Sequence, residues 1–321
     1  MKLQQIRHLV STEQQAVDKL IIDSLHSEVP LIEQIGHYIV NSGGKRLRPL
    51  IVLLSALACG YRERQHIDLA AIIEFIHTAT LLHDDVIDKS TLRRGQATAN
   101  AIWNDHSSVL VGDFLYSRAF QMMVQLDNMQ VLQIIADTTN TISEGEVLQL
   151  LNTNDAATDE KRYFNVIKRK TAILFATSSK LGAVISNSDA TLYKALNNYG
   201  LNFGVAYQLI DDILDYRSEA KNIGKNIGDD LAEGKPTLPL IYLLQYGSAE
   251  QGKIVRNAIT HGKLKHLKEI QQAIDDSGAI AYTLKTAQQY ADRANDALQC
   301  LPGSDYKQVL SELVELLLQQ A

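Results

Sequence analysis

Apolar residues recur at intervals of three and four positions over most of this chain. Strand-like alternation is scarce. Clusters of turn-forming residues, such as 41–44 and 222–237, separate the periodic windows, and no Pro/Ser-rich linker divides the chain. The pattern predicts an all-α protein, a single large helical bundle of ten or more helices that spans 1–321 as one domain. The clearest helical windows are 68–88, 107–126, 129–151, 163–185, 191–216 and 282–301.

The composition limits the classes of function. The chain has 321 residues, of which 45% are hydrophobic and 21% charged, as in an ordinary globular protein. The formal net charge is −6 and no basic stripe is apparent, so nucleic acid is not expected as a partner. Cys59 and Cys300 suggest no disulfide framework and fit a reducing cytoplasm. Residues 1–20 lack a signal core, and the longest apolar run, 49–59, is too short to span a bilayer. We therefore expect a cytoplasmic protein with no transmembrane segment.

An Asp-Asp-x-x-Asp pattern occurs twice, at 84–88 and at 211–215, each time within an apolar helical window. Positions i and i+4 share one face of a helix, so each copy projects clustered carboxylates. A single copy is more often a solvated helix face, but two copies in apolar surroundings require counter-cations. Magnesium prefers oxygen ligands and often completes its shell with substrate phosphates. The repeated pattern therefore predicts a Mg²⁺ site.

Basic residues accompany both acidic motifs. A glycine-rich segment, 43–49, carries Lys45 and Arg48, and the adjacent Arg93 and Arg94 follow the first motif. Arginine and lysine in these settings suit phosphate oxygens, although a solvated helix start is an equally good interpretation of the 43–49 segment alone. His77 lies two helical turns before Asp84 on the same face, where a lone histidine is more often structural. The second motif is preceded by Gln208 and followed by a Gly- and Lys-rich loop, a candidate lid. Together these groups suit a substrate with a diphosphate head and a long hydrocarbon tail.

Motifs spread over nearly the whole chain resemble the trans-isoprenyl diphosphate synthase, or polyprenyl synthetase, family. The amino-acid sequence of residues 74–82 most resembles that of the bacterial octaprenyl diphosphate synthases of that family. The resemblance implies an isoprenoid-synthase helical bundle around a deep central cavity. The motifs that carry it are Gly43-Gly44-Lys45-Arg46-Leu47-Arg48-Pro49, His83-Asp84-Asp85-Val86-Ile87-Asp88, Arg93-Arg94-Gly95, Gly145-Glu146, Lys170-Thr171, Gln208-Leu209-Ile210-Asp211-Asp212-Ile213-Leu214-Asp215 and Gly234-Lys235-Pro236-Thr237.

The resemblance also implies roles for individual residues. Asp84, Asp88 and Asp211 would bind Mg²⁺, with Asp85, Asp212 and Asp215 as supporting ligands. Catalysis would rest on Asp84, Asp88, Asp211, Lys170 and Lys225. The allylic diphosphate would contact Arg93, Lys170, Thr171, Gln208, Lys225 and Lys235. Isopentenyl diphosphate would be held by Lys45, Arg48, His77 and Arg94.

The implied reaction begins when the allylic C–O bond breaks and leaves an allylic cation. The double bond of isopentenyl diphosphate attacks that cation and a proton is lost, in a cavity that excludes water. Short-chain members of the family often carry a bulky aromatic near the position of Ala79 or Thr80, which are small here. Met122 and Met123 are candidates for the floor of the product tunnel, although each also fits ordinary core packing. We expect a product of about C40, octaprenyl diphosphate, made from farnesyl diphosphate for a quinone side chain such as that of ubiquinone.

Three alternatives stay open. The chain could be a short-chain synthase with a C15 or C20 product, a class I terpene cyclase, or a non-catalytic partner subunit of a heteromeric synthase. Cyclases usually carry a different second metal motif, and partner subunits typically lose one acidic motif, whereas both are intact here. The resemblance further suggests a homodimer.

Overall fold

The computed structural model describes residues 3–217, 228–262 and 266–320, and these residues are almost entirely helical. The predicted all-α class is confirmed. The predicted lid residue Lys225 lies outside the described residues. Contacts within the chain define two compact units, one of Met1–Ala136, Thr177–Asn197 and Cys300–Glu312, and one of Asp137–Ala176, Asn198–Gln299 and Leu313–Ala321. The expectation of a single domain stays a prediction.

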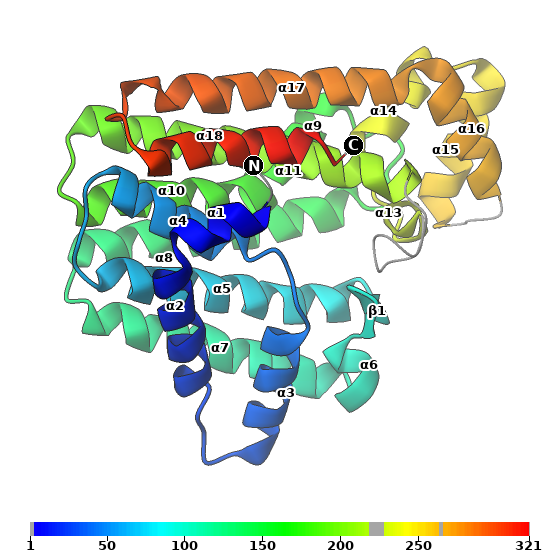
Figure 1. Ribbon diagram of the computed structural model, residues 1–321. Helices are drawn as coiled ribbons and strands as arrows, with labels where there is room; N and C mark the ends of the chain where they lie inside the picture. The colour runs from blue at the N-terminus through cyan, green and yellow to red at the C-terminus, as the bar shows by residue number, and fades with distance from the viewer. Residues whose placement is uncertain (1–2, 218–227, 263–265, 321) are drawn as a thin grey trace. The chain divides into compact units, whose positions relative to one another are not determined.

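In the first unit, α5 (Gln65–Ile87) packs against α2, α4 and α7, and Figure 1 shows α5 and α7 running alongside each other. The apolar run at 49–59 forms a helix whose residues are buried from Pro49 to Ala58, as the sequence predicts. Burial of apolar side chains such as these is the dominant favourable contribution to folding. The other helices that begin and end in this unit are α1 (Leu3–Leu9), α2 (Ser11–Ser24), α3 (Pro30–Asn41), α4 (Leu47–Ala58), α6 (Ala99–Trp103) and α7 (Asp105–Gln125).

A short hairpin follows the first acidic motif, although the hydrophobic pattern gave no sign of strands. β1 (Leu92–Arg93) pairs antiparallel with β2 (Gln96–Ala97), and Arg94 and Gly95 form the two-residue loop. Both loop residues have positive φ, 55° and 77°, as the preferred two-residue hairpin turn requires. The tight turn sends the adjacent side chains of Arg93 and Arg94 in different directions.

In the second unit, the window 163–185 contains a change of helix type. A π-helical turn, η1 (Lys168–Ala172), lies between α9 (Glu160–Ile167) and α10 (Ile173–Ile185). A Cβ at Gly145 would lie 2.7 Å from the backbone nitrogen of Lys170, so glycine is needed for the close approach of α8 (Met129–Asn152). Single π turns are frequent at functional sites. This one carries Lys170 and Thr171.

The second unit also contains a group of helices around α14 (Leu238–Tyr246), which packs against α15, α16 and α17. Helices α8, α10, α11 and α18 have residues in both units. The remaining bounds are α11 (Ala190–Arg217), α13 (Asp229–Ala232), α15 (Ala249–His261), α16 (Leu267–Ser277), α17 (Ala279–Ala297), the 3₁₀ turn η3 (Leu298–Cys300) and α18 (Asp305–Leu318).

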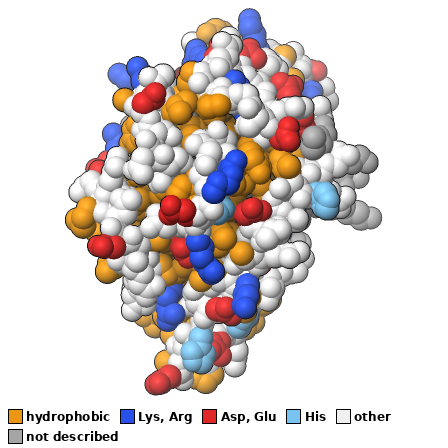
Figure 2. All heavy atoms as spheres, turned by 60° about the vertical axis from the view of Figure 1, so that its left-hand side comes forward, with side chains coloured by type: hydrophobic (Ala, Val, Ile, Leu, Met, Phe, Trp, Pro, Cys, Tyr) orange, Lys and Arg blue, Asp and Glu red, His pale blue; other side chains and the backbone are white. Residues whose placement is uncertain are grey.

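No helix of the described residues is both long and apolar enough to cross a membrane. On the face drawn in Figure 2, Lys and Arg side chains are interspersed with Asp, Glu and apolar side chains instead of forming one basic patch.

Candidate active site

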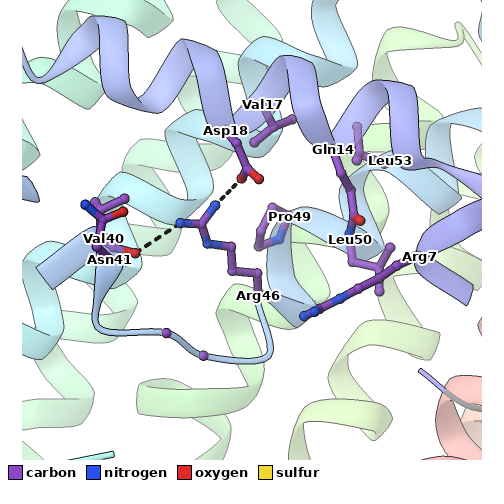
Figure 3. Close-up of a pocket in the computed structure, with 12 residues that line it drawn as sticks. Arg7, Gln14, Val17, Asp18, Val40, Asn41, Arg46, Pro49, Leu50 and Leu53 are labelled. Atoms are coloured by element: carbon purple, nitrogen blue, oxygen red, sulfur yellow. Dashed lines mark hydrogen bonds and ion pairs between the residues drawn. The ribbon is translucent and has the colours of Figure 1, made fainter. Parts of the chain in front are cut away.

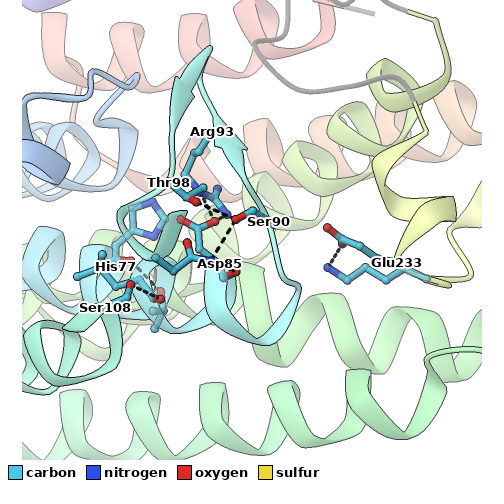
Figure 4. A network of polar contacts seen from close by, with 11 residues as sticks. His77, Asp85, Ser90, Arg93, Thr98, Ser108 and Glu233 are labelled. Atoms are coloured by element: carbon cyan, nitrogen blue, oxygen red, sulfur yellow. Dashed lines mark hydrogen bonds and ion pairs between the residues drawn. The ribbon is translucent and has the colours of Figure 1, made fainter. Parts of the chain in front are cut away.

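The first acidic motif lies at the end of α5, where its three aspartates have different surroundings. Asp85 is 0% exposed, whereas Asp84 and Asp88 are half-buried. Arg93 donates to Asp85 Oδ1 from Nε at 2.8 Å, and its Nη2 lies 2.7 Å from the same oxygen (Figure 4). Burial raises the pKa of Asp85, and the hydrogen bond from Arg93 opposes that rise. Asp85 is therefore a buried partner of Arg93, while Asp84 and Asp88 reach the surface.

Asp85→Ala is expected to lower the free energy of unfolding by about 3 kcal/mol or more, because it leaves the largely buried Arg93 without its partner. The double variant Asp85→Ala/Arg93→Ala should lose less than the sum of the two single changes. Urea denaturation of the three variants measures this. Asp113→Ala, on an exposed aspartate, is the control. Additive losses would show that the pair is not coupled.

His77, two helical turns before Asp84 on α5, is close to a group of arginines. Arg48 Nη1 lies 3.1 Å from His77 Nε2. Burial lowers the pKa of His77 well below its usual value, and the charges of Arg48, Arg94 and Arg93 lower it further. A neutral His77 accepts the hydrogen bond of Arg48 at Nε2 and carries its proton on Nδ1. It thus orients Arg48 without adding a positive charge to the cluster.

This pKa gives a pH dependence of stability. In the unfolded chain a histidine has a pKa near 6.5. At a pH between the lowered pKa of folded His77 and 6.5, the unfolded state therefore binds more protons than the folded state. The contribution of the neutral, buried His77 to the free energy of unfolding is therefore fully present above about pH 6.5 and is lost as the pH falls below that value. Between about pH 7 and pH 5.5, the wild type should lose more free energy of unfolding than His77→Gln, by at most about 1.4 kcal/mol per pH unit. Equal pH slopes in urea denaturation would contradict the assignment.

The glycine-rich segment approaches the same cluster. Arg94 donates from Nη1 to the carbonyl oxygen of Gly43. A Cβ on Gly44 would lie 2.6 Å from the Arg94 guanidinium carbon, and the φ of Gly44 is +127°, so only glycine fits there. The structure thus gathers the loop of Lys45 with Arg48, His77 and Arg94, the four residues predicted to hold one diphosphate.

The second acidic motif repeats the arrangement of the first. Asp212 is 1% exposed and accepts hydrogen bonds from Tyr163 Oη at 2.5 Å and Gln208 Nε2 at 2.8 Å, whereas Asp211 is half-buried. Burial raises the pKa of Asp212, and the charge of Asp230 raises it further. Asp215, at 9% exposed, is also buried. In both motifs, then, the middle aspartate is fixed by other side chains and the first one is accessible.

The predicted contacts of the allylic diphosphate in the second unit have carboxylate or amide partners. Thr171 Oγ1 donates to Gln208 Oε1 at 3.0 Å. Lys170 Nζ lies 2.5 Å from Glu146 Oε2, and Lys235 Nζ lies 2.5 Å from Glu233 Oε2. Glu146 belongs to one of the family motifs, but no role was predicted for it, for Tyr163 or for Glu233. The sequence feature that could have revealed Glu146 is a glutamate that follows Gly145 within an otherwise apolar window.

The donor chemistry of the motifs fits Mg²⁺ bound together with a phosphate ligand. Among the described residues, no group of three His, Cys, Asp or Glu side chains is placed to hold a metal ion. Each motif instead offers accessible carboxylate oxygens on one helix turn, and Mg²⁺ commonly combines one or two carboxylates with water and substrate phosphates.

The predicted chain-length residues lie on two adjacent helices of the first unit. Ala79 is 0% exposed on α5, one residue before Thr80, whose hydroxyl donates to the carbonyl of His77. Met122 and Met123 are buried on α7, which packs along α5. This packing is compatible with a product tunnel and also with an ordinary core, so their role stays a prediction.

Comparison with known proteins identifies the class. The sequence model of the Polyprenyl synthetase family matches residues 29–277. The octaprenyl diphosphate synthase of Escherichia coli (strain K12) is 46% identical over 100% of this chain and 99% of its own. An all-trans-nonaprenyl-diphosphate synthase (geranyl-diphosphate specific) of Rhodobacter capsulatus is 45% identical over 94% of this chain and 93% of its own.

A crystal structure of polyprenyl synthase from Caulobacter crescentus CB15, complexed with calcium and isoprenyl diphosphate, superposes with a TM-score of 0.96. The two chains are 41% identical, with 99% of this chain and 97% of that one covered. This chain belongs to the polyprenyl synthetase family. Its full-length likeness to octaprenyl diphosphate synthases places it among the long-chain trans-polyprenyl synthases, which are prenyltransferases. The family resemblance and the class of function predicted from the sequence are thereby confirmed.

Proposed function

We propose that this chain extends an allylic diphosphate, farnesyl diphosphate, with successive isopentenyl diphosphate units to octaprenyl diphosphate, about C40. The observation that carries the proposal is the shared arrangement of the two acidic motifs. In each, the middle aspartate is buried and hydrogen-bonded, and the first aspartate is accessible. Such motifs present rigid carboxylates to a cation without burying all of their charge.

We assign the roles as the sequence predicted them. Asp84, Asp88 and Asp211 would hold Mg²⁺ and, with it, the allylic diphosphate, while Asp85, Asp212 and Asp215 stabilise the conformation of the motifs. When bound, Mg²⁺ neutralises the diphosphate charge that develops as the allylic C–O bond breaks. The contacts of the allylic diphosphate are Arg93, Lys170, Thr171, Gln208, Lys225 and Lys235.

Isopentenyl diphosphate binds at Lys45, Arg48, His77 and Arg94. Arg48 is oriented by the neutral His77 and presents a planar cation that matches phosphate oxygens. The Lys170–Glu146 and Lys235–Glu233 pairs hold those ammonium groups in place until diphosphate oxygens replace the glutamates as partners. Fixed cations of this kind favour departure of the diphosphate, because they need not reorganise as charge develops.

The proposal is tested by incubating the purified chain with Mg²⁺, farnesyl diphosphate and labelled isopentenyl diphosphate. We expect label in a long-chain product, and none when EDTA removes the metal. A labelled product that stops at C20 would instead support a short-chain synthase. If the chain forms no product with any allylic primer and becomes active only when a second polypeptide is added, it is a partner subunit.

We further propose a cytoplasmic homodimer that supplies a quinone side chain such as that of ubiquinone, acting as one domain over 1–321. Large apolar side chains are exposed on α7, among them Leu110 and Val124, each 67% exposed, with Met129 at 76% at the start of α8. Exposed apolar side chains mark a protein interface where they form one contiguous patch. Light scattering that gave the mass of a single chain would contradict the homodimer.

A further inference from the structure

The segment 43–46, which carries Lys45 and leads into the helix of Arg48, lies beside a pocket of about 310 Å³. Arg7, Asp18 and Arg46 line this pocket, together with apolar residues of α4 (Figure 3). A loop with open space beside it is poorly supported by packing, because its atoms lack neighbours on that side. Hydrogen bonds must therefore determine where the loop lies.

Arg46 makes such bonds across the pocket. Its Nη1 pairs with Asp18 Oδ1 on α2, and its Nη2 donates to the carbonyl oxygen of Val40, near the end of α3, at 3.0 Å (Figure 3). One guanidinium thus connects the loop to two helices. Its side chain is 24% exposed, whereas that of Asp18 is 57% exposed.

The backbone of Arg46 is also unusual. Its φ of 38° and ψ of 44° are left-handed, a conformation that costs energy for any residue except glycine. A strained residue persists only when surrounding contacts hold it. The contacts around Arg46 include the two bonds of its own side chain, one from Arg7 Nη2 to the carbonyl of Lys45 at 2.8 Å, and the bond from Arg94 to the carbonyl of Gly43. The left-handed residue sets the direction in which the chain enters α4, and so the placement of Lys45 and Arg48 on either side of it.

We propose that Arg46 and Asp18 are positioning residues for isopentenyl diphosphate: the Arg46 guanidinium, held by Asp18 and the Val40 carbonyl, fixes the left-handed turn that aims Lys45 and Arg48 at the diphosphate. The inference rests on the proposed binding of that substrate by Lys45 and Arg48. It assigns a function to helices α1 and α2, to which the sequence motifs gave none.

Asp18→Asn is a useful test because a purely electrostatic effect and a loss of positioning would change the affinity for isopentenyl diphosphate in opposite directions. The change removes a negative charge near a cationic site, so a purely electrostatic effect would tighten the binding of an anion. Loss of positioning weakens it instead. Asp23→Asn, on an exposed aspartate of the same helix, makes the same charge change without touching Arg46 and is the matched control.

The measurements are binding of isopentenyl diphosphate by calorimetry in EDTA and steady-state kinetics in Mg²⁺. In EDTA the acidic motifs have no metal to bridge to a diphosphate, so the calorimetric signal reports binding by the cationic side chains. We expect Asp18→Asn to raise Kd and KM for isopentenyl diphosphate by about threefold to tenfold, as a factor of this size fits the loss of one partly exposed charged hydrogen bond. Asp23→Asn should change them by less than about twofold, and KM for the allylic diphosphate and kcat should stay unchanged in both.

Arg46→Lys is the second variant, because lysine keeps the charge but is a point donor that lacks the guanidinium fork. It should raise the same Kd and KM with little change in melting temperature. Unchanged or tighter binding in Asp18→Asn, or equal losses for both substrates with a lower melting temperature, would overturn the inference. If the wild type itself failed to bind isopentenyl diphosphate, the proposed function would fail instead, which keeps the two failures distinct.

Discussion

Asp211→Asn is expected to lower kcat by about 10²- to 10³-fold, the scale of losing one preorganised electrostatic contact to a developing charge. The amide keeps the size of the side chain but loses the negative charge that attracts Mg²⁺. Asp211 is half-buried and accessible, unlike its neighbour Asp212, so the change should leave the melting temperature nearly intact. Steady-state kinetics with farnesyl and isopentenyl diphosphates, at several Mg²⁺ concentrations, measure the effect.

Two comparisons make this result specific. Glu250→Gln removes a carboxylate from an exposed position of α15 and should leave kcat within about twofold, as surface changes usually do. Raised Mg²⁺ should restore part of the activity of Asp211→Asn, because weaker binding is offset by mass action. If Asp211→Asn kept the wild-type kcat at low Mg²⁺, Asp211 would not be a ligand of the metal.

With farnesyl diphosphate as primer, Ala79→Tyr is expected to shorten the product from about C40 to about C20. Ala79 lies five residues before Asp84, roughly 7–8 Å along the helix axis, and it is fully buried on α5, a helix that packs against α7. A tyrosine at this position would occupy the path that the growing chain takes if the product tunnel runs along α5. Mass spectrometry of the extracted products gives the chain length directly.

The stability of this variant must be measured in parallel, because a larger side chain in a packed core costs about 1–3 kcal/mol. Ala79→Ser adds only one oxygen atom and should keep the long product, so it serves as the size control. If Ala79→Tyr is folded and still makes a product of about C40, the tunnel does not pass Ala79.

The periodic part of the fold was accessible from the sequence. The window 68–88 became α5 (Gln65–Ile87), and 191–216 became α11 (Ala190–Arg217), within a few residues at each end. Apolar spacing determines which face of a helix is buried, so it predicts such helices well. It does not report a local change of hydrogen-bond register, and the π turn at 168–172 therefore escaped prediction.

The candidate site was predictable in its residue types and not in its pairings. Nothing in the spacing distinguishes Asp85 from Asp84, yet Asp85 is buried and paired with Arg93, whereas Asp84 is accessible. Tyr163 reaches Asp212 and Arg7 reaches the carbonyl of Lys45 across 49 and 38 residues of sequence. Contacts of that separation depend on helix packing, which a single sequence does not encode in any short pattern.

The most direct test of the account is the mass of the product made by the purified wild-type chain from farnesyl diphosphate, isopentenyl diphosphate and Mg²⁺. We expect an all-trans polyprenyl diphosphate that accumulates at about C40 and is absent with EDTA. A product that ends at C20 or below, a cyclised hydrocarbon, or a long product formed equally well without divalent metal would contradict it.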